Sequence, residues 1–219
     1  MGDATILETL VVGPLAVNCY ILGDEKTREG IVIDPGDDAR DIINTIKTLQ
    51  LKVVAIVNTH AHFDHVGALD EVREYTDAPF MLHEDEVAIL DAASASAAAF
   101  RIRISISQPP DRLLHEGEEI RAGSIVLKVL HTPGHTPGGI CLLEGSHVFV
   151  GDTLFQGSIG RTDFPGGDYG TLMGSIRDQL MPLPDETIVH PGHGPATTMG
   201  AEKQSNPFLR PLVTGKWDV

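Results

Sequence analysis

The chain has 219 residues, of which 42% are hydrophobic and 21% are charged, a composition typical of a globular protein that buries a core. Its formal net charge of −15 at pH 7 opposes binding to phosphate backbones and to anionic lipid surfaces, so neither nucleic acid nor a membrane is expected as a partner. No apolar run is long enough to span a membrane and no basic cluster precedes an apolar run at the N-terminus, so no signal peptide is expected and the expected location is the cytoplasm.

The first part of the chain predicts short strands separated by turns. β-branched and apolar residues gather between Gly, Pro and Asp turns, and they predict strands at residues 5–12, 18–22, 31–33, 53–57 and 79–82. The run Val53–Val57 is apolar throughout, which is typical of a strand buried on both faces. Apolar residues at the spacing of one helix face predict a helix over residues 37–49, and a second helix is expected from Val66 to about Tyr75.

Residues 84–107 are expected to form a helical or irregular excursion over the surface that shapes one wall of a site, because Ala92–Phe100 is rich in Ala and Ser. A helix is expected over residues 171–180. Further strands are expected at residues 112–115, 119–121, 124–131, 140–143, 147–150 and 187–190. Strands and helices thus alternate in two similar runs with no linker between them, which predicts a single α/β domain over residues 1–219 with two sheets covered by outer helices.

Four side chains that can bind metal follow the strand at 53–57. His60 and His62 stand two apart, and in an extended chain such residues point the same way, so both imidazoles can reach one ion. Asp64 and His65 are expected in a turn and aim past that ion toward a second one. A lone histidine is more often structural than ligating, but four metal-capable residues in one short segment favour a metal site.

Three more candidates repeat this context, because each follows an apolar strand and each lies beside a glycine that lets the backbone bend. They are His135, Asp152 and His193. Ligands gathered from several strand ends are what a rigid polynuclear site requires. The expected cofactors are two divalent metal ions, with zinc as the first expectation and iron or manganese as alternatives, since imidazole and carboxylate suit all three.

The remaining histidines and the cysteines are expected to be structural. His131 and His190 lie close to candidate ligands in sequence, and support or packing is expected for both. The side chains expected to have no role in the site are His83, His115, His147 and the two cysteines, Cys19 and Cys141, which should stay reduced.

In combination these motifs resemble those of the metallo-β-lactamase-fold hydrolases. The matching pieces are Thr59-His60-Ala61-His62-Phe63-Asp64-His65, Thr132-Pro133-Gly134-His135-Thr136, Gly151-Asp152-Thr153-Leu154-Phe155, Pro191-Gly192-His193-Gly194 and the early turn Asp34-Pro35-Gly36. The resemblance runs from about Leu10 to Leu209 and implies a four-layer αβ/βα sandwich with the metals at one edge. It also implies that His60, His62 and His135 hold one ion, that Asp64, His65 and His193 hold the other, and that Asp152 bridges them.

Within this superfamily, Gly157–Phe164 and the tail Asn206–Leu209 resemble the glyoxalase II group, the hydroxyacylglutathione hydrolases, and above all its short bacterial members without a C-terminal helical domain. Arg161 falls where longer members place a basic residue that binds glutathione, so it is a candidate for substrate binding. The alternative is a solvated surface arginine paired with Asp163. Because the additional helical domain helps those enzymes to bind glutathione, the thiol carrier stays open.

The resemblance implies a small-molecule thioester substrate such as S-lactoylglutathione, cleaved to a hydroxy acid and a free thiol. Water bound to zinc loses its proton at a pKa of about 7, and the resulting hydroxide is expected to attack the thioester carbonyl. Asp64 is expected to act as the catalytic residue that binds metal and orients this nucleophile. No Gly-x-Ser-x-Gly elbow is present, so a serine nucleophile is not expected.

Several alternatives to this hydrolase can be judged against the same residues. A mononuclear-iron persulfide dioxygenase has the same His60–His65 segment, but His193 and Asn206-Pro207-Phe208 favour the hydrolase. A lactonase or β-lactamase would share the site and differ in the pocket walls. A non-catalytic metal-binding module would have lost ligands, whereas all seven are present. The sequence leaves the oligomeric state open.

Overall fold

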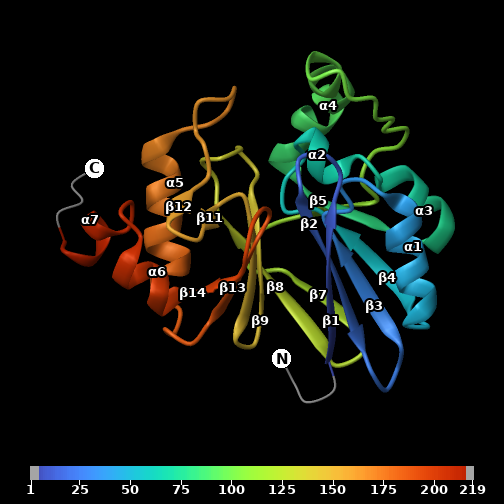
Figure 1. Ribbon diagram of the computed structural model, residues 1–219, viewed down its shortest axis with the longest axis horizontal. Coiled ribbons are helices and arrows are strands. Elements are labelled where there is room, and N and C mark those ends of the chain that lie inside the picture. The colour runs from blue at the N-terminus through green and yellow to red at the C-terminus, as the bar shows by residue number, and fades with distance from the viewer. Residues whose placement is uncertain (1–4, 216–219) are drawn as a thin grey trace.

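The computed structural model describes residues 5–215, and its centre is a pair of six-stranded sheets packed face to face (Figure 1). In the first sheet, β1 to β3 run antiparallel to their neighbours, and β3 to β6 are parallel. Its strands, in spatial order, are β1 (Thr5–Val12), β2 (Val17–Asp24), β3 (Glu29–Ile33), β4 (Lys52–Val57), β5 (Phe80–His83) and β6 (Arg112–Leu114).

The second sheet comes from the second half of the chain and is antiparallel except for the parallel pair β10 and β13. Its strands, in spatial order, are β14 (Thr197–Thr198), β13 (Ile188–Pro191), β10 (His147–Gly151), β9 (Ile140–Glu144), β8 (Ile125–His131) and β7 (Glu119–Ala122). A separate ribbon pairs β11 (Leu154–Phe155) with β12 (Ser158–Ile159).

Helices cover the outer face of each sheet (Figure 1). The first half supplies α1 (Ala39–Thr48), α2 (Phe63–Val66), α3 (Leu69–Thr76), a 3₁₀ turn (Glu84–Glu86) and α4 (Val87–Ala99). The second half supplies α5 (Tyr169–Ser175), which continues into a π-helical turn (Ile176–Leu180), then α6 (Met199–Ser205) and α7 (Arg210–Val213). Among the described helices, none combines the length and the apolar character that a membrane crossing requires.

Three apolar layers hold this arrangement together. The central layer lies between the two sheets, where Ile31 and Ile33 of the first sheet and Leu127 and Phe149 of the second belong to one fully buried cluster. The outer layers pack α1 and α3 on the first sheet and α5 on the second. The order helix, sheet, sheet, helix confirms the predicted four-layer αβ/βα sandwich. Neither buried cysteine is joined in a disulfide.

One prediction of a helix was wrong in its bounds. The helix expected from Val66 to about Tyr75 is α3, which begins later, at Leu69, and a separate short helix, α2, precedes it. Asp64 and His65, which were expected in a turn, lie in α2. The break occurs at Gly67, where a Cβ atom would lie 2.3 Å from the carbonyl oxygen of Gly36. This close approach allows the Asp34–Gly36 turn to pack beneath α2, which positions the residues that follow β4.

Candidate metal centre

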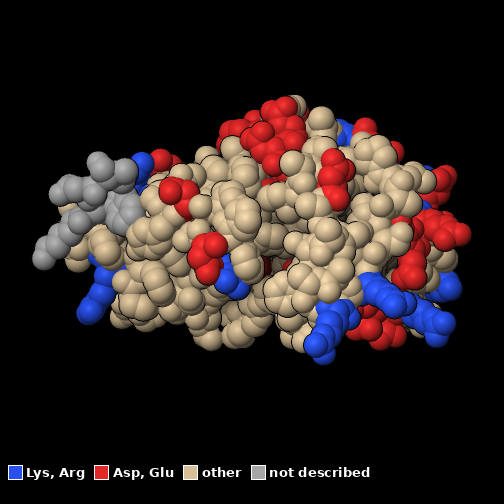
Figure 2. Space-filling view, turned by 90° about the horizontal axis from the view of Figure 1, so that it is seen from above, with Lys and Arg blue, Asp and Glu red and all other residues tan. Residues whose placement is uncertain are grey.

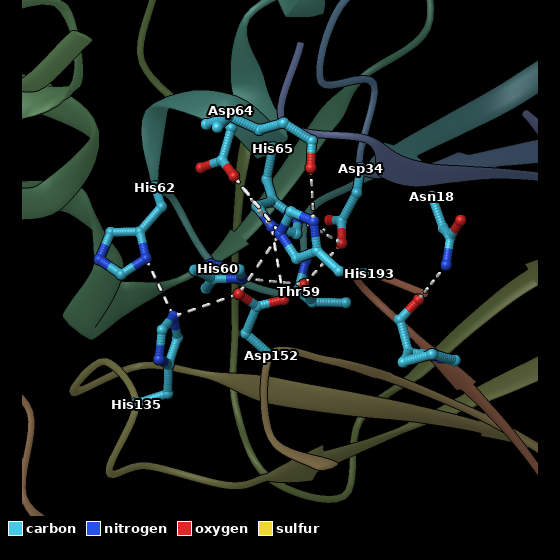
Figure 3. Close-up of polar contacts among 12 residues, drawn as sticks. Asn18, Asp34, Thr59, His60, His62, Asp64, His65, His135, Asp152 and His193 are labelled. Atoms are coloured by element: carbon cyan, nitrogen blue, oxygen red, sulfur yellow. Dashed lines mark hydrogen bonds and ion pairs between the residues drawn. The ribbon is translucent and has the colours of Figure 1, made fainter. Parts of the chain in front are cut away.

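The seven predicted ligands meet at one edge of the sandwich, where strands from both sheets end (Figure 3). His60 and His62 lie in the loop after β4, and Asp64 and His65 lie in α2. The second sheet contributes the other three from the residues that follow β8, β10 and β13, namely His135, Asp152 and His193. Positions far apart in the sequence therefore form one cluster.

His60, His62 and His135 form the first group, whose ligand atoms all lie within 4.8 Å of one another. His135 donates from Nδ1 to the carbonyl oxygen of Arg161 at 2.7 Å, which leaves its Nε2 lone pair facing His62 Nδ1 at 3.0 Å. Burial lowers the pKa of His62 to about 3, with a further contribution from His135, and burial also lowers the pKa of His60 and His135. The three imidazoles are therefore neutral near pH 7, the form that binds a metal ion.

Asp64, His65 and His193 form the second group. His193 donates from Nδ1 to the carbonyl oxygen of Leu15 at 3.0 Å, and its Nε2 lies 3.4 Å from Asp64 Oδ2. Burial opposes a positive charge on His65, but the carboxylates of Asp152 and Asp34 outweigh it and raise its pKa to about 10. Burial likewise opposes the ionised form of Asp64, yet His193 and His65 hold its pKa well below the usual range. This group is thus built to hold positive charge.

Asp152 lies between the two groups. One carboxylate oxygen is 3.5 Å from His65 Nε2, and the other is 3.7 Å from His135 Nε2 and 3.6 Å from His193 Nε2. Asp152 therefore reaches members of both groups, which is the place that the sequence resemblance implies for a bridging carboxylate. The backbone of Gly192 packs against the Asp152 carboxylate, and only glycine permits this contact, because a Cβ atom at Gly192 would lie 2.2 Å from Asp152 Oδ1.

The centre contains buried polar atoms without hydrogen-bond partners, and these test whether a cation fits. Such atoms include His60 Nε2, His65 Nε2 and Asp152 Oδ1, whose three residues form a further group within 4.8 Å. An unpaired buried polar atom costs about 1–3 kcal/mol, so three facing one another would be unfavourable unless a common partner satisfies them. Imidazole nitrogens and a carboxylate oxygen are ligands of divalent transition metals. The residues present therefore fit a metal ion.

The buried carboxylate of Asp34 accepts hydrogen bonds from residues of this cluster and of the loop after β4. Its Oδ1 accepts the backbone N–H of Thr59 at 2.7 Å and its Oδ2 accepts the Thr59 hydroxyl at 2.7 Å. Its Oδ2 also accepts Nδ1–H of His65 at 3.1 Å (Figure 3). Because Nδ1 keeps its proton in this bond, a cation that displaces the proton from His65 Nε2 would find the Nε2 lone pair facing the centre. Asp34 therefore fixes both the ring orientation and the tautomer of a candidate ligand.

We expect Asp34→Asn to weaken the affinity of the second group for metal by about 10- to 100-fold, the usual effect of losing such a support. An amide nitrogen facing His65 Nδ1 would donate to it and move the imidazole proton to Nε2, which could then no longer bind an ion. Competition with a chromophoric chelator measures the affinity. Asp41→Asn removes the same charge from an exposed position and is the control. Equal affinities for the two variants would contradict the role of Asp34.

Glu86 contacts the loops that carry the candidate ligands, and the sequence did not single it out. It is fully buried at the start of α4, where Oε2 accepts the backbone N–H of Ala61 at 2.7 Å and Oε1 accepts that of Gly138 at 2.8 Å. Burial raises its pKa despite these bonds. Ala61 separates His60 from His62, and Gly138 closely follows His135. One carboxylate thus joins the ligand loops of the two sheets.

β2 anchors the loop that carries His193. The side-chain amide of Asn18 donates to the carbonyl oxygens of Pro191 at 2.9 Å and Gly194 at 2.8 Å, and the Tyr20 hydroxyl donates to Pro191 at 2.7 Å. Asn18 was not predicted, because these partners lie more than 170 residues away along the chain. The N-terminal sheet therefore holds a ligand loop of the C-terminal sheet in place.

The other histidines lie outside the cluster, as predicted. His147 and His190 share a hydrogen bond of 2.8 Å, and His83 stacks on His131 with ring centroids 4.1 Å apart. His83, His131 and Asp85 also place ligand atoms within 4.8 Å. However, His83 Nδ1 accepts the N–H of Asp85, His131 Nε2 donates to Pro137, and the stacked rings are inclined by only 12°, so their lone pairs do not converge.

A cavity of about 540 Å³ opens above the cluster, in the size range of small-molecule sites. One wall is α4, so the structure bears out the expectation that residues 84–107 shape a site. Arg161 lies at this cavity with its guanidinium bound to Asp163 through two hydrogen bonds of 2.7 and 2.8 Å. Arg161 is thus both paired with Asp163 and placed where a ligand could contact it, and contact with substrate stays a prediction.

Comparison with known proteins supports the assignment of the fold. The model of the metallo-beta-lactamase superfamily matches residues 12–193. The chain is 42% identical to the probable metallo-hydrolase YqgX of Bacillus subtilis, over 90% of this chain and 94% of that protein. It is 39% identical to the hydroxyacylglutathione hydrolase GloC of Haemophilus influenzae, over 93% of this chain and 97% of that protein.

Several solved structures resemble this chain in both fold and sequence. The BLEG-1 B3 metallo-beta-lactamase has a TM-score of 0.87 at 41% identity, covering 93% of this chain and 99% of that one. TTHA1623 in a di-iron-bound form has a TM-score of 0.85 at 42% identity, covering 92% and 100%. ETHE1 from Myxococcus xanthus has a TM-score of 0.78 at 30% identity, covering 97% and 92%. The chain belongs to the metallo-beta-lactamase superfamily.

Proposed function

We propose that the protein is a dinuclear metallohydrolase that cleaves thioesters to a carboxylic acid and a free thiol. The observation that carries this proposal is the complete second ligand group, Asp64, His65 and His193, beside a carboxylate, Asp152, that also reaches the first group. A mononuclear centre of two histidines and an aspartate would not use this second group of side chains to bind an ion. The 39% identity to a hydroxyacylglutathione hydrolase favours a thioester over other esters, and the di-iron form of TTHA1623 favours two ions.

The proposed ions are zinc, with iron or manganese as alternatives for this ligand set. Divalent cations held by the two groups would supply Lewis acidity, which would make water nucleophilic near neutral pH and polarise a carbonyl oxygen. His60, His62 and His135 contribute neutral lone pairs, because burial lowers the pKa of each.

Asp64 is the proposed catalytic residue. It stays ionised because its hydrogen bond with His193 and the charge of His65 outweigh the effect of burial on its pKa. A carboxylate at this position can hold an ion and accept a hydrogen bond from the attacking water, which orients a lone pair of the water toward the carbonyl. The leaving thiol has a pKa of about 8.5, so it departs as a thiolate and needs no acid from the protein.

The test combines metal analysis with two assays on the same purified sample. We expect two ions per chain, and release of thiol without oxygen from S-lactoylglutathione or from the hexanoyl thioester of N-acetylcysteamine. Chelation should abolish the activity and zinc should restore it. One iron per chain together with oxygen uptake on glutathione persulfide would establish a dioxygenase instead. Hydrolysis of lactones without hydrolysis of either thioester would establish a lactonase.

A further inference from the structure

The wall that α4 presents to the cavity is uncharged and is made mostly of small side chains, with Ile89 as a larger apolar member. Ala88, Ala92 and Ser96 recur at intervals of four on one face of the helix, and all three are exposed. The other face of α4 is buried in the core through Leu90 and Ala97. Because the side chains on the open face are short, the space above the metal centre stays free for a ligand.

Large apolar side chains complete this surface. Phe100 is 57% exposed at the end of α4, and Leu15 is 41% exposed. Both line the cavity, together with Phe63 and Phe164. Figure 2 shows the hollow between the two halves walled largely by side chains that carry no charge. Exposed apolar surface that converges on a polar centre favours a ligand with an apolar part.

The cavity offers almost no positive charge apart from the metal centre. Among its lining residues in the described part of the chain, Arg161 is the one lysine or arginine. Its guanidinium is bound by both carboxylate oxygens of Asp163 and lies 3.6 Å from the centroid of the Phe164 ring. The pairing with Asp163 compensates the charge of Arg161, and the whole chain carries −15. A substrate with free carboxylates, such as a glutathione thioester, therefore meets no unpaired cation on these walls.

We propose that the preferred substrate is an apolar acyl thioester of an uncharged thiol, with the acyl chain lying along α4, and that Asp163 reduces binding of anionic carriers by holding Arg161. This inference rests on the proposed thioester hydrolysis and specifies its substrate class. Complete burial of one methylene is worth about a fourfold gain in binding, so a hexanoyl group should gain over an acetyl group even on a half-open wall.

The first experiment compares kcat/KM for acetyl and hexanoyl thioesters of N-acetylcysteamine, which is uncharged, and of glutathione. We expect hexanoyl to exceed acetyl by about tenfold or more on the neutral carrier, since several methylenes are partly buried. We also expect kcat/KM for the neutral carrier to exceed that for glutathione by about tenfold with the same acyl group. The reason is that a glutathione carboxylate would lose water at these walls without gaining a cationic partner. Equal values along the acyl series, or a preference for glutathione, would overturn the inference.

Two variants test the residues named. Ala92→Asp places a charge on the wall and should lower the hexanoyl-to-acetyl ratio by about tenfold, whereas Ala95→Asp puts the same charge on an exposed position of α4 outside the cavity lining and should leave the ratio unchanged. Asp163→Asn frees Arg161 and should raise kcat/KM for glutathione thioesters relative to neutral ones by about fivefold. A ratio that responds equally to Ala92→Asp and Ala95→Asp would contradict the role of the α4 wall.

A binding measurement separates this inference from the proposed function. The uncleavable thioethers S-hexyl-N-acetylcysteamine and S-hexylglutathione are titrated calorimetrically into the metal-loaded protein. Tighter binding of the neutral thioether, weakened by Ala92→Asp, supports the substrate class even if no thioester is hydrolysed, and in that case only the proposed reaction fails. Tighter binding of the glutathione thioether overturns the inference while thioester hydrolysis can still stand.

Discussion

Replacing Asp152 with alanine is expected to lower kcat/KM for thioester hydrolysis by about 10³-fold or more, the several kcal/mol of transition-state stabilisation that a metal centre supplies. The carboxylate oxygens of Asp152 lie 3.5–3.7 Å from Nε2 of His65, His135 and His193, so its removal takes a candidate ligand from both groups at once. It also removes the negative charge that supports the raised pKa of His65. We therefore expect both ions to bind more weakly.

Metal content after gel filtration and steady-state kinetics measure this effect together. Asp178→Ala is a suitable control, because Asp178 is exposed and pairs only with its neighbour Arg177 among the contacts described. Unfolding of the metal-free proteins shows whether the fold itself is intact. A variant that keeps two ions and near-normal turnover would show that Asp152 does not join the two groups.

Replacing Glu86 with alanine is expected to reduce the free energy of unfolding by about 2–6 kcal/mol, since two buried N–H groups would each lose a charged acceptor at about 1–3 kcal/mol. The donors are Ala61 and Gly138, in the loops that carry His60, His62 and His135. Loosening both loops should also weaken metal binding by about 10-fold or more, as with other supports of ligands.

Urea denaturation of the metal-free protein measures the stability, and chelator competition measures the affinity. Glu84→Ala removes a neighbouring glutamate whose carboxylate is exposed and faces His115, and we expect a change of no more than about 0.5 kcal/mol. If Glu86→Ala resembled Glu84→Ala in both measurements, Glu86 would have no role in joining the two loops.

The candidate ligands could be predicted because each carries its context in the adjacent sequence. An apolar strand, a glycine and a metal-capable side chain follow one another around His135, Asp152 and His193, and the chain ends its strands where this pattern places them. The four layers follow from the alternation of strands and helices for the same reason. Local sequence contains this information because an apolar run indicates a buried strand, and a glycine beside it indicates a sharp bend of the backbone.

The supporting residues could not be predicted in this way. Glu86 belongs to the acidic run Glu84-Asp85-Glu86, which in sequence is indistinguishable from solvated surface, and its partners lie 25 and 52 residues away. Asn18 acts on carbonyl groups more than 170 residues distant. Such roles arise only when tertiary contacts bring the partners together.

Small errors in the predicted elements have similar causes. The helix break at Gly67 reflects contact with Gly36 on another segment, and no periodicity reveals it. The strands β11, β12 and β14 have two residues each, which is too short for an alternating pattern. In α4 one face packs on the core and the other lines a cavity, so apolar residues occur on both sides and the pattern of an ordinary surface helix is absent.

The division of the ligands between the two sheets has a consequence for the integrity of the chain. The first sheet and its loops carry His60, His62, Asp64 and His65, and the second carries the remaining three, so neither group of candidate ligands is complete on one side. If the chain were severed between Leu114 and Glu119, each fragment would hold only a partial set. Metal ions would then add a reversible link between two separate polypeptides that also share the apolar layer between the sheets, so a higher concentration of free metal would strengthen their association.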